Sequence, residues 1–288
     1  MTLRAPAKVN LHLEVIGRRP DGYHELVSLF QAVSLWDYIR ISAAGPAGRL
    51  SVSGDFPFPA EQNIIARAIR AFRAETGIGE GIEVAVKKRI PFGGGFGGGS
   101  SDAAATLRGL AALFDEQLTG ERLLGIGASL CSDVPFFLRS AAALVEGRGE
   151  KVTPIAPRED FLVVAVTPHL SVSTVEAYRW IDERWDAMPR SGLSPEAVVA
   201  AYRETDVADW RFTNSFDAAV FERHPGIGAL RSALVSRGAV SARLTGSGST
   251  VIGIFVDADL AADCARAMSG SCRFSAVLRP LAGIPPIC

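Results

Sequence analysis

The sequence of 288 residues predicts an α+β fold in two lobes, with largely antiparallel sheets. Apolar residues make up 48% of the chain and charged residues 21%, as in soluble globular domains, so a sizeable core can form. Segments with the apolar period of a strand and segments with that of a helix are mixed along the chain rather than strictly alternating. The sequence pattern changes near residue 155, which predicts an N-terminal domain over 1–155 and a C-terminal domain over 156–288.

The first half opens with a strand. Residues 9–15 alternate apolar and polar side chains, which predicts that the strand is half-buried. Its polar face would carry Lys8, Asn10, His12 and Glu14. A turn at 19–22 leads to a second apolar segment. The remaining elements expected here are that segment over 26–41, helices over 63–75, 103–115 and 122–130, a strand over 82–86, and a hairpin over 141–153 that turns at 146–149.

The second half mixes short apolar strands with amphipathic helices. A glycine-rich turn over 245–250 separates two of the strands. We expect strands over 161–166, 242–244, 251–256 and 273–279, and helices around 174–186, 195–204, 215–223, 227–237 and 258–269.

Charge and cysteine usage exclude several classes of protein. Thirty Lys and Arg against thirty-one Asp and Glu give a net charge of −1, so the chain has no global attraction for nucleic acid or an anionic membrane. No apolar run approaches the roughly eighteen residues of a membrane-spanning helix, and the first residues do not form a signal peptide. Cys131, Cys264, Cys272 and Cys288 are scattered, which disfavours disulfides and zinc. We expect a cytoplasmic protein.

The most distinctive segment is the loop over 91–102, with the sequence PFGGGFGGGSSD. Glycine fills six of the seven positions from 93 to 99, so backbone N–H groups can turn towards one point. The loop lies between a predicted strand and a predicted helix whose first turn begins with the N-cap residues Ser-Ser-Asp. An anion there would meet free N–H groups and the positive end of the helix dipole. Polyphosphate is the natural ligand.

A flexible linker or a known nucleotide-binding loop of another class fits this segment less well. A linker is seldom bracketed by an apolar strand and an alanine-rich helix. The GxGxxG pattern of dinucleotide-binding folds is matched only trivially in such a glycine run, and the βαβ order expected of those folds does not open the chain. A Walker loop is excluded because Gly-Lys-Ser/Thr does not occur, and protein-kinase signatures are missing.

Three segments in order resemble the motifs of the small-molecule kinases that include galactokinase, homoserine kinase, mevalonate kinase and phosphomevalonate kinase. They are residues 5–11 (APAKVNL), the glycine loop, and residues 244–249 (LTGSGS). The loop departs from the family pattern in having Phe96 where leucine is usual and an extra glycine in place of the first serine. The resemblance implies a two-lobed kinase fold, with an N-terminal lobe like the second domain of ribosomal protein S5 and a ferredoxin-like C-terminal lobe.

Within this family, residues 21–26 (DGYHEL), the loop and residues 131–136 (CSDVPF) are similar to the branch whose acceptor is a cytidine-diphosphate-linked methylerythritol, in the non-mevalonate isoprenoid pathway. The resemblance implies ATP-dependent phosphorylation of the 2-hydroxyl of that small molecule, with Mg²⁺. It implies no nucleic acid, membrane or obligate protein partner. Two alternatives stay open: a relative acting on homoserine, mevalonate or a sugar, and a nucleotide-binding protein without catalysis.

Phosphoryl transfer to an alcohol needs a phosphate cradle, charge neutralisation and a group that takes or steers the hydroxyl proton. The resemblance makes Asp133 the catalytic aspartate. A neighbouring Lys8 would keep that carboxylate ionised and stabilise developing alkoxide charge. On spacing alone, Asp133 fits an N-cap or turn residue equally well, and Lys8 fits a solvated lysine at a strand edge.

The acceptor is expected to lie between the lobes. His24 can hydrogen-bond the edge of a pyrimidine and Tyr23 offers a stacking face. A zinc-binding HExxH motif does not start at His24, because residue 28 is serine. By similarity, Tyr178 is the second aromatic wall around cytosine, although a tyrosine at helical spacing is more often a core residue. The other residues expected to bind substrate are Asn10, Asp133, Thr174, Gly246, Ser247 and Gly248.

By resemblance, Asn63 and Lys88 lie near the adenine side of ATP, while the alternatives are a helix N-cap for Asn63 and a solvated cation for Lys88. We expect Asp102 to face outward as a capping residue, because inside it would repel triphosphate. Cys131 should be small and buried. No carboxylate cage stands out, so the protein ligands of Mg²⁺ are unknown and water and phosphate should hold most of it. The expected loop contacts to ATP are Pro91, Gly93, Gly94, Gly95, Gly97, Gly98, Gly99, Ser100 and Ser101.

Overall fold

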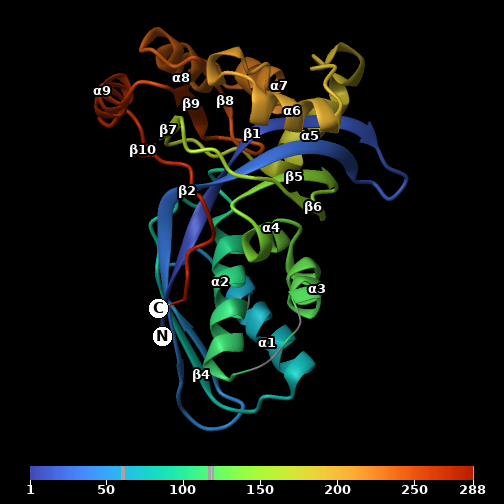
Figure 1. Ribbon diagram of the computed structural model, residues 1–288, viewed down its shortest axis with the longest axis vertical. Coiled ribbons are helices and arrows are strands. Elements are labelled where there is room, and N and C mark those ends of the chain that lie inside the picture. The colour runs from blue at the N-terminus through green and yellow to red at the C-terminus, as the bar shows by residue number, and fades with distance from the viewer. Residues whose placement is uncertain (60–61, 116–117, 119, 288) are drawn as a thin grey trace.

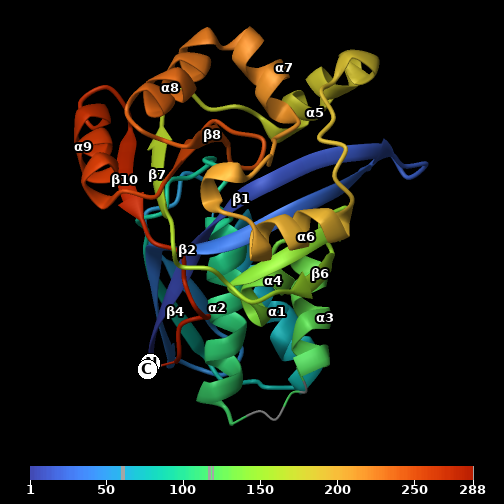
Figure 2. The same ribbon diagram turned by 45° about the horizontal axis from the view of Figure 1, so that its top comes forward.

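The computed structural model describes residues 1–59, 62–115, 118 and 120–287, and it confirms the α+β fold in two lobes (Figures 1 and 2). The first lobe contains a six-stranded sheet in which β3, β4, β2, β5 and β6 follow one another and β1 pairs with β2. The second lobe contains a four-stranded sheet of order β10-β7-β9-β8. All pairings are antiparallel except that of β3 with β4.

Two long strands, β1 (Thr2–Arg18) and β2 (His24–Ala43), support the first lobe. β2 pairs with β4 (Ile82–Lys87) through its C-terminal part and with β5 (Ala142–Gly147) through its N-terminal part. In Figure 1 the two blue strands run from the base of the first lobe to the underside of the second. The motif at the start of the chain is thereby carried to the space between the lobes. The remaining strands are β3 (Leu50–Ser53) and β6 (Lys151–Pro154).

The predicted polar face of the first strand is only half correct. The pairing of β1 with β2 shifts register between Asn10 and His12, as in a β-bulge, which inserts an extra residue and changes the face that follows. Lys8 and Asn10 line the cleft between the lobes, and beyond the shift it is Leu13 that lines it. His12 is fully buried beside Phe212 instead. Both faces of the strand are covered, so it is buried rather than half-buried.

Four helices cover one face of the first sheet (Figure 1). The first begins at the N-cap Asn63 and ends at Gly77, which has φ of 77°, as the sequence predicts. The helix predicted over 103–115 begins earlier, at Gly98, because the last glycines of the loop already have helical conformation. The bounds are α1 (Ile64–Thr76), α2 (Gly98–Leu113), α3 (Gly120–Leu130) and α4 (Val134–Arg139).

The second lobe has ferredoxin-like order. Numbered from its first strand, its strands lie in the order 4-1-3-2 and all pair antiparallel. The predicted elements are present with shifts of a few residues at their ends. The strands are β7 (Leu162–Thr167), β8 (Ser241–Leu244), β9 (Val251–Phe255) and β10 (Phe274–Leu278), and the helices are α5 (Thr174–Glu183), η2 (Trp185–Ala187), α6 (Pro195–Glu204), η3 (Val207–Asp209), α7 (Phe216–Arg223), α8 (Pro225–Ser236) and α9 (Ala258–Met268).

The two lobes share their apolar cores. Leu13 and Val15, at the far end of β1, are buried with the helices of the second lobe. Near the C-terminus the chain returns to the first lobe, where Leu281 N–H donates to Ala32 O at 3.0 Å. A boundary at residue 155 therefore separates the sheets but not the cores, and the division of the chain into two domains stays a prediction. No helix among the described residues is long and apolar enough to cross a membrane.

The sequence missed three short elements, β3, α4 and the 3₁₀ turn η3. β3 is a four-residue strand at the edge of the sheet, half of it serine. α4 has only six residues and starts with proline in its first turn, so it has little helical period to detect. Cys131, Cys264 and Cys272 are free thiols, and Cys288 lies outside the described residues.

Candidate active site

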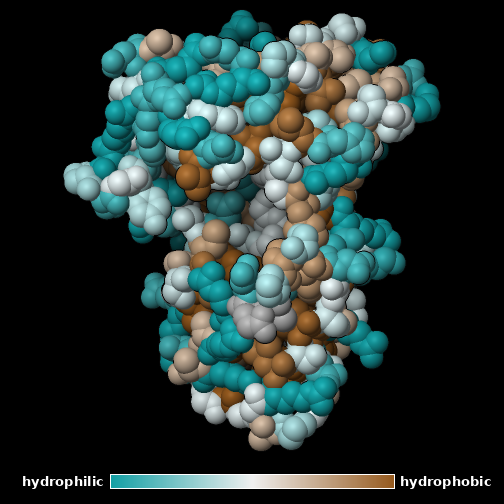
Figure 3. Space-filling model, turned by 180° about the vertical axis from the view of Figure 1, so that it is seen from behind, coloured by the Kyte–Doolittle hydropathy of each residue, from teal (hydrophilic) through white to brown (hydrophobic). Residues whose placement is uncertain are grey.

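Two adjoining cavities meet at the glycine loop. A cleft of about 350 Å³ between the lobes is lined by side chains from β1, β2, the start of α4, α5 and the 246–247 turn. A cavity of about 290 Å³ lies on the other side of the loop and is lined by residues 90–100 together with Ile64 and Lys88. Gly95 and Gly97 line both. The space-filling view shows that the molecule narrows between the two lobes (Figure 3).

The loop depends on glycine at particular positions. Gly93, Gly95 and Gly97 have φ between 67° and 77°, the left-handed region that other residues rarely adopt. A Cβ on Gly95 would lie 2.0 Å from Thr245 O. The backbone of the loop therefore contacts the backbone of the glycine-rich turn after β8, which is called the C-terminal turn below. Phe96 is buried and anchors the middle of the loop. No side chain caps α2, which leaves the N–H groups of its first turn free for an anion.

Asp102 is not the outward-facing cap that the sequence predicted. Its carboxylate is buried in α2, 2.7 Å from Lys88 Nζ, and the same ammonium group contacts Asp37. Asp37 also accepts from the backbone N–H of Arg89 and Ile90. The expected repulsion of triphosphate is avoided because the Asp102 side chain lies inside the fold, in contact with Lys88. Burial, with the nearby Asp37 carboxylate, raises the pKa of Asp102 to about 8 against the opposing effect of Lys88.

Lys88 is therefore not a solvated cation at a strand end. Its side chain is 7% exposed, although its residue still lines the cavity beside the loop. Asn63 does cap α1, because its Oδ1 accepts from Ile65 N–H at 2.9 Å. Its Nδ2 is buried with no partner among the described residues, so both N–H donors of the amide are unused.

Lys8 and Asp133 face each other across the cleft. The Lys8 side chain is 5% exposed and its Nζ lies 3.7 Å from Asp133 Oδ2. Burial lowers the pKa of Lys8, and the Asp133 carboxylate opposes that shift. Asp133 occupies the N-cap position of α4, yet its side chain makes no capping hydrogen bond. These two side chains are thus neither a solvated lysine nor an ordinary helix cap.

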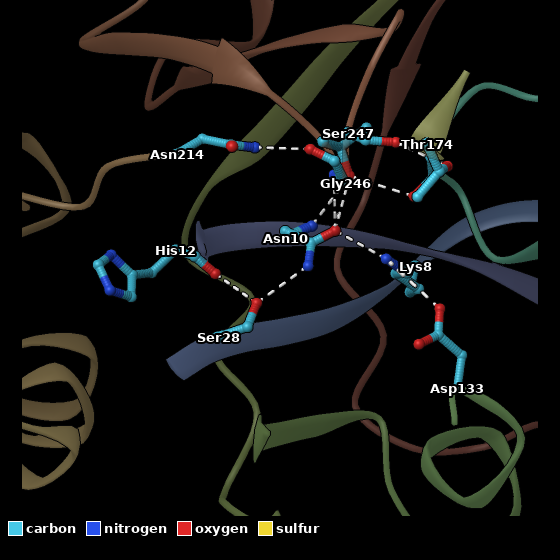
Figure 4. A network of polar contacts seen from close by, with 11 residues as sticks. Lys8, Asn10, His12, Ser28, Asp133, Thr174, Asn214, Gly246 and Ser247 are labelled. Carbon is cyan, nitrogen blue, oxygen red and sulfur yellow. Dashed lines mark hydrogen bonds and ion pairs between the residues drawn. The ribbon is translucent and has the colours of Figure 1, made fainter. Parts of the chain in front are cut away.

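Asn10 lies at the centre of a network between the lobes (Figure 4). Its Oδ1 accepts from Lys8 Nζ at 2.7 Å and from Gly246 N–H at 2.8 Å. Its Nδ2 donates to Ser28 Oγ at 2.9 Å. Asn10 therefore holds the lysine and the C-terminal turn, and its amide oxygen is already occupied.

Only some of the residues predicted to bind the acceptor line the cleft. Thr174 and Ser247 share a hydrogen bond of 2.9 Å between their hydroxyl groups, and both line the cleft. Gly246 and Tyr178 also line it. Gly248, Tyr23 and His24 do not, and the side chain of Tyr23 points to solvent with 57% exposure.

His24 and Tyr178 stack on one another beside the cleft. Their ring centroids are 4.7 Å apart, with an angle of 24° between the planes. His24 Nε2 lies 2.9 Å from Asp182 Oδ1, and Arg18 Nε forms an ion pair with the same oxygen at 2.8 Å. Burial raises the pKa of Tyr178 to about 12, with a further contribution from Asp133, so the phenol stays neutral.

The sequence missed Arg148 and misplaced Cys131. Arg148 lines the cleft from the turn between β5 and β6, and its guanidinium lies 4.8 Å from the centroid of the Tyr23 ring. An arginine in a Glu-Gly-Arg-Gly turn carries no signal of function by itself. Cys131 was expected to be buried, but it is exposed, because it precedes α4 at the mouth of the cleft.

No group of three or more His, Cys, Asp or Glu side chains that could hold a metal ion occurs in the part of the chain that the structure describes. A larger hollow of about 890 Å³ lies between residues 43–47 and 76–81, at the far end of the first lobe. Its lining is mostly glycine and alanine with one carboxylate, Glu80, so it offers little chemistry.

Comparison with known families gives two matches. Residues 63–141 match the N-terminal domain of the GHMP kinases, and residues 203–273 match the C-terminal domain of the same kinases. These segments contain the glycine loop and Asp133 in the first lobe and the C-terminal turn in the second.

Individual relatives match over most of the chain. A protein of Treponema pallidum (strain Nichols) is 40% identical over 264 residues, which cover 89% of this chain and 90% of that protein. One of Geobacter metallireducens is 38% identical over 276 residues, covering 94% and 95%. Both bear the name 4-diphosphocytidyl-2-C-methyl-D-erythritol kinase.

Solved structures agree in fold. A crystal structure of 4-(cytidine 5'-diphospho)-2C-methyl-D-erythritol kinase has a TM-score of 0.82 and 33% identity, covering 97% of this chain and 99% of that one. Homoserine kinase from Cytophaga hutchinsonii has a TM-score of 0.74 at 20% identity, covering 98% and 95%, and shares the fold.

Proposed function

This chain belongs to the GHMP kinases and, within them, to the 4-diphosphocytidyl-2-C-methyl-D-erythritol kinases, and from that premise we propose how its site works. It transfers the γ-phosphoryl group of ATP to the 2-hydroxyl of 4-diphosphocytidyl-2-C-methyl-D-erythritol, an intermediate of the non-mevalonate isoprenoid pathway. The observation that carries the proposal is the Lys8–Asp133 pair in a cleft directly adjoining a glycine loop with free N–H groups.

The glycine loop binds the triphosphate. Its N–H groups and those of the first turn of α2 meet the phosphate oxygens, and the helix dipole adds to the attraction. The nucleoside extends along the 290 Å³ cavity towards Ile64, with Asn63 Nδ2 as an unused donor at that end. Pro91 and residues 93–101 supply the remaining contacts.

The acceptor alcohol enters the cleft opposite the loop. Asp133 accepts the proton of the 2-hydroxyl while the oxygen attacks the γ-phosphorus, the bond to the β-phosphate oxygen breaks, and ADP leaves. Lys8 neutralises the charge that develops between the alcohol and the phosphoryl group. Thr174, Ser247 and Arg148 line the cleft around the rest of the acceptor, and Arg148 is suited to its diphosphate.

Mg²⁺ bound together with ATP would supply neutralisation of the charge on the transferred group. The donors nearest the proposed phosphates fit an ion held mainly by phosphate and water. The Ser100 hydroxyl, which lines the cavity beside the loop, would be the donor from the protein. The Asp102 carboxylate is held by Lys88 and serves the fold instead.

Cytosine is recognised by His24 beside Tyr178. An ionised carboxylate accepts hydrogen bonds and cannot donate one, so the Nε2 of His24 that lies 2.9 Å from Asp182 Oδ1 carries a hydrogen. In the neutral ring Nδ1 is then an acceptor, and it has no partner among the described residues. That acceptor matches the exocyclic amine of cytosine and opposes the carbonyl of uracil.

The test is a coupled assay of ADP release with the cytidylyl alcohol, homoserine, mevalonate and a sugar as acceptors. The proposal expects turnover of the cytidylyl alcohol only, and loss of turnover by about a thousandfold or more in Asp133→Asn with ATP still bound. Asp209→Asn is a matched control because Asp209 lies outside both cavities. Turnover of mevalonate instead, or full activity of Asp133→Asn, would contradict the proposal. A cytoplasmic location and action without a protein partner stay predictions.

A further inference from the structure

We propose that Asn214, in the loop that precedes α7, is a positioning residue that holds the Lys8 ammonium group in place through the 244–246 turn and Asn10. The inference rests on the proposed function in one respect, the use of Lys8 in phosphoryl transfer. Asn214 itself does not line the cleft, so it would act on the reaction through other residues and not by touching substrate.

The first link joins Asn214 to the turn. Asn214 is 5% exposed, and its Nδ2 donates to Leu244 O at 2.8 Å and to Gly246 O at 2.9 Å. Its Oδ1 accepts from Phe216 N–H at 2.9 Å. Both ends of the amide are therefore in use, and two carbonyl groups of the turn are held by one side chain (Figure 4). Without Asn214 these buried carbonyls would lose their partner.

The second link joins the turn to Asn10. Gly246 N–H donates to Asn10 Oδ1 at 2.8 Å. The Thr245 hydroxyl accepts from Asn10 N–H at 3.0 Å and donates to Asn10 Oδ1 at 3.2 Å. The same turn presses on the glycine loop, where Thr245 O is so near Gly95 that no Cβ fits. A shift of the turn would thus be felt on both sides of the reacting groups.

The third link joins Asn10 to Lys8. The Asn10 oxygen accepts from Lys8 Nζ at 2.7 Å, and its Nδ2 donates to Ser28 Oγ, which in turn donates to His12 O at 2.5 Å. The groups around the Asn10 oxygen are donors and the group beside its nitrogen is an acceptor, so they determine which way the Asn10 amide is turned. The orientation in turn fixes where the ammonium group sits relative to Asp133, 3.7 Å away.

The chain of contacts has a measurable consequence for charge. A hydrogen bond from the ammonium group to an amide oxygen favours the charged form of Lys8, which burial disfavours. If the turn is released, Lys8 loses part of that support and its pKa falls further. The titratable groups that face Lys8 are Asp133 and Cys131, and neither is altered by changes at Asn214 or Thr245.

The experiment compares Asn214→Ala and Thr245→Val with the wild-type enzyme, using ATP and the cytidylyl alcohol. Thr245→Val keeps the shape of the side chain while removing the two hydrogen bonds of the Thr245 hydroxyl to Asn10, and the bond from Gly246 N–H to Asn10 remains. We expect kcat to fall by about tenfold to a hundredfold in both, with KM for ATP within about twofold. We also expect the alkaline limb of the kcat–pH profile to move to lower pH.

Ser215→Ala is the matched control. Ser215 neighbours Asn214 and is also buried, but its hydroxyl accepts from Val15 N–H at 3.0 Å and does not touch the turn. It should lower the melting temperature without moving the pH profile. A merely structural role for Asn214 predicts the same outcome for its own variants, and that result would overturn the inference.

A double-mutant cycle completes the test. If Asn214 acts through Asn10, then Asn214→Ala should cost nothing further in kcat once Asn10→Ala is present. Losses that multiply would overturn the inference. If Asn214→Ala does not fold, Thr245→Val decides through the pH profile. Failure of the wild-type enzyme to use the cytidylyl alcohol would instead refute the proposed function, and the Lys8 shift can then be measured with the acceptor it does use.

Discussion

Replacing Lys88 by methionine should destabilise the protein more than any nearby surface change. Lys88 is the cation between two buried carboxylates, Asp37 and Asp102, which are 0% and 3% exposed in their side chains. Burial alone would lower the pKa of Lys88, but the two carboxylates outweigh it and raise that pKa. Methionine keeps the length of the side chain and removes the charge, so the variant leaves both carboxylates without their shared counter-ion.

The magnitude follows from the burial. Removing one partner of a buried ion pair costs about 3–5 kcal/mol in unfolding free energy, and no discount for solvent applies here because all three groups are nearly inaccessible. At about 2 °C per kcal/mol for a chain of this size, the melting temperature should fall by about 6–10 °C. Without Lys88 the pKa of Asp102 should rise above the value of about 8 that it has in the wild type, because Lys88 opposes the effect of burial. A carboxyl whose pKa is raised in the folded state costs stability above its unfolded pKa, so the deficit relative to wild type should shrink as the pH falls.

The assay is thermal unfolding followed by circular dichroism between pH 5 and pH 9. Lys87→Met, an exposed lysine at the adjacent position of the chain, is the control and should stay within about 0.5 kcal/mol of wild type. Asp102→Asn in the Lys88→Met background should recover part of the loss, because one uncompensated charge is removed. Equal melting temperatures for the two lysine variants would refute the reasoning, as would a deficit that grows on acidification.

Two further predictions concern recognition. Asp182→Ala should reduce the preference for the cytidine over the uridine form of the acceptor by about fivefold in kcat/KM, because the His24 imidazole is then free to change tautomer. Asp186→Ala is the control, and an unchanged ratio of the two kcat/KM values in Asp182→Ala contradicts the assignment. Gly95→Ala should raise KM for ATP by about tenfold or more, because the new Cβ would lie 2.0 Å from Thr245 O. Gly120→Ala is the control, because a Cβ there meets no atom within 4 Å, and equal KM values for the two variants would refute the loop's role.

Most of the fold could be predicted from the sequence because apolar periods reveal which segments pack. The helix caps at Asn63 and Gly77 and the glycine turn after β8 are local signals of the same kind. The first strand was wrongly predicted as half-buried because both of its faces are covered by tertiary contacts. Its polar face was wrong beyond Asn10 because a β-bulge depends on the partner strand, and nothing in residues 8–14 marks it. Likewise α4 is too short to show a period.

The site shows the same division between local and tertiary information. The glycine loop could be found from composition, because few sequences other than an anion cradle place six glycines between a strand and a helix. Asp102 was placed wrongly because its position follows from Lys88 and Asp37, which lie 14 and 65 residues away along the chain. Arg148 was missed because it reaches the cleft only through the pairing of β5 with β2. Contacts between charged residues that are far apart along the chain cannot be predicted from the local sequence pattern.

The scarcity of lysine has a physical reason at two positions. The chain has four lysines among thirty basic residues, and two of them, Lys8 and Lys88, are inaccessible while the other two are exposed. At position 8 a compact ammonium group fits between Asn10 Oδ1 at 2.7 Å and Asp133 at 3.7 Å, with the centroid of the Phe30 ring at 4.3 Å. A guanidinium group would instead bind both oxygens of the carboxylate as a planar fork. The lone pairs that remain would be less basic than beside a single ammonium group, so arginine, the common cation elsewhere in this chain, suits the proposed chemistry less well here.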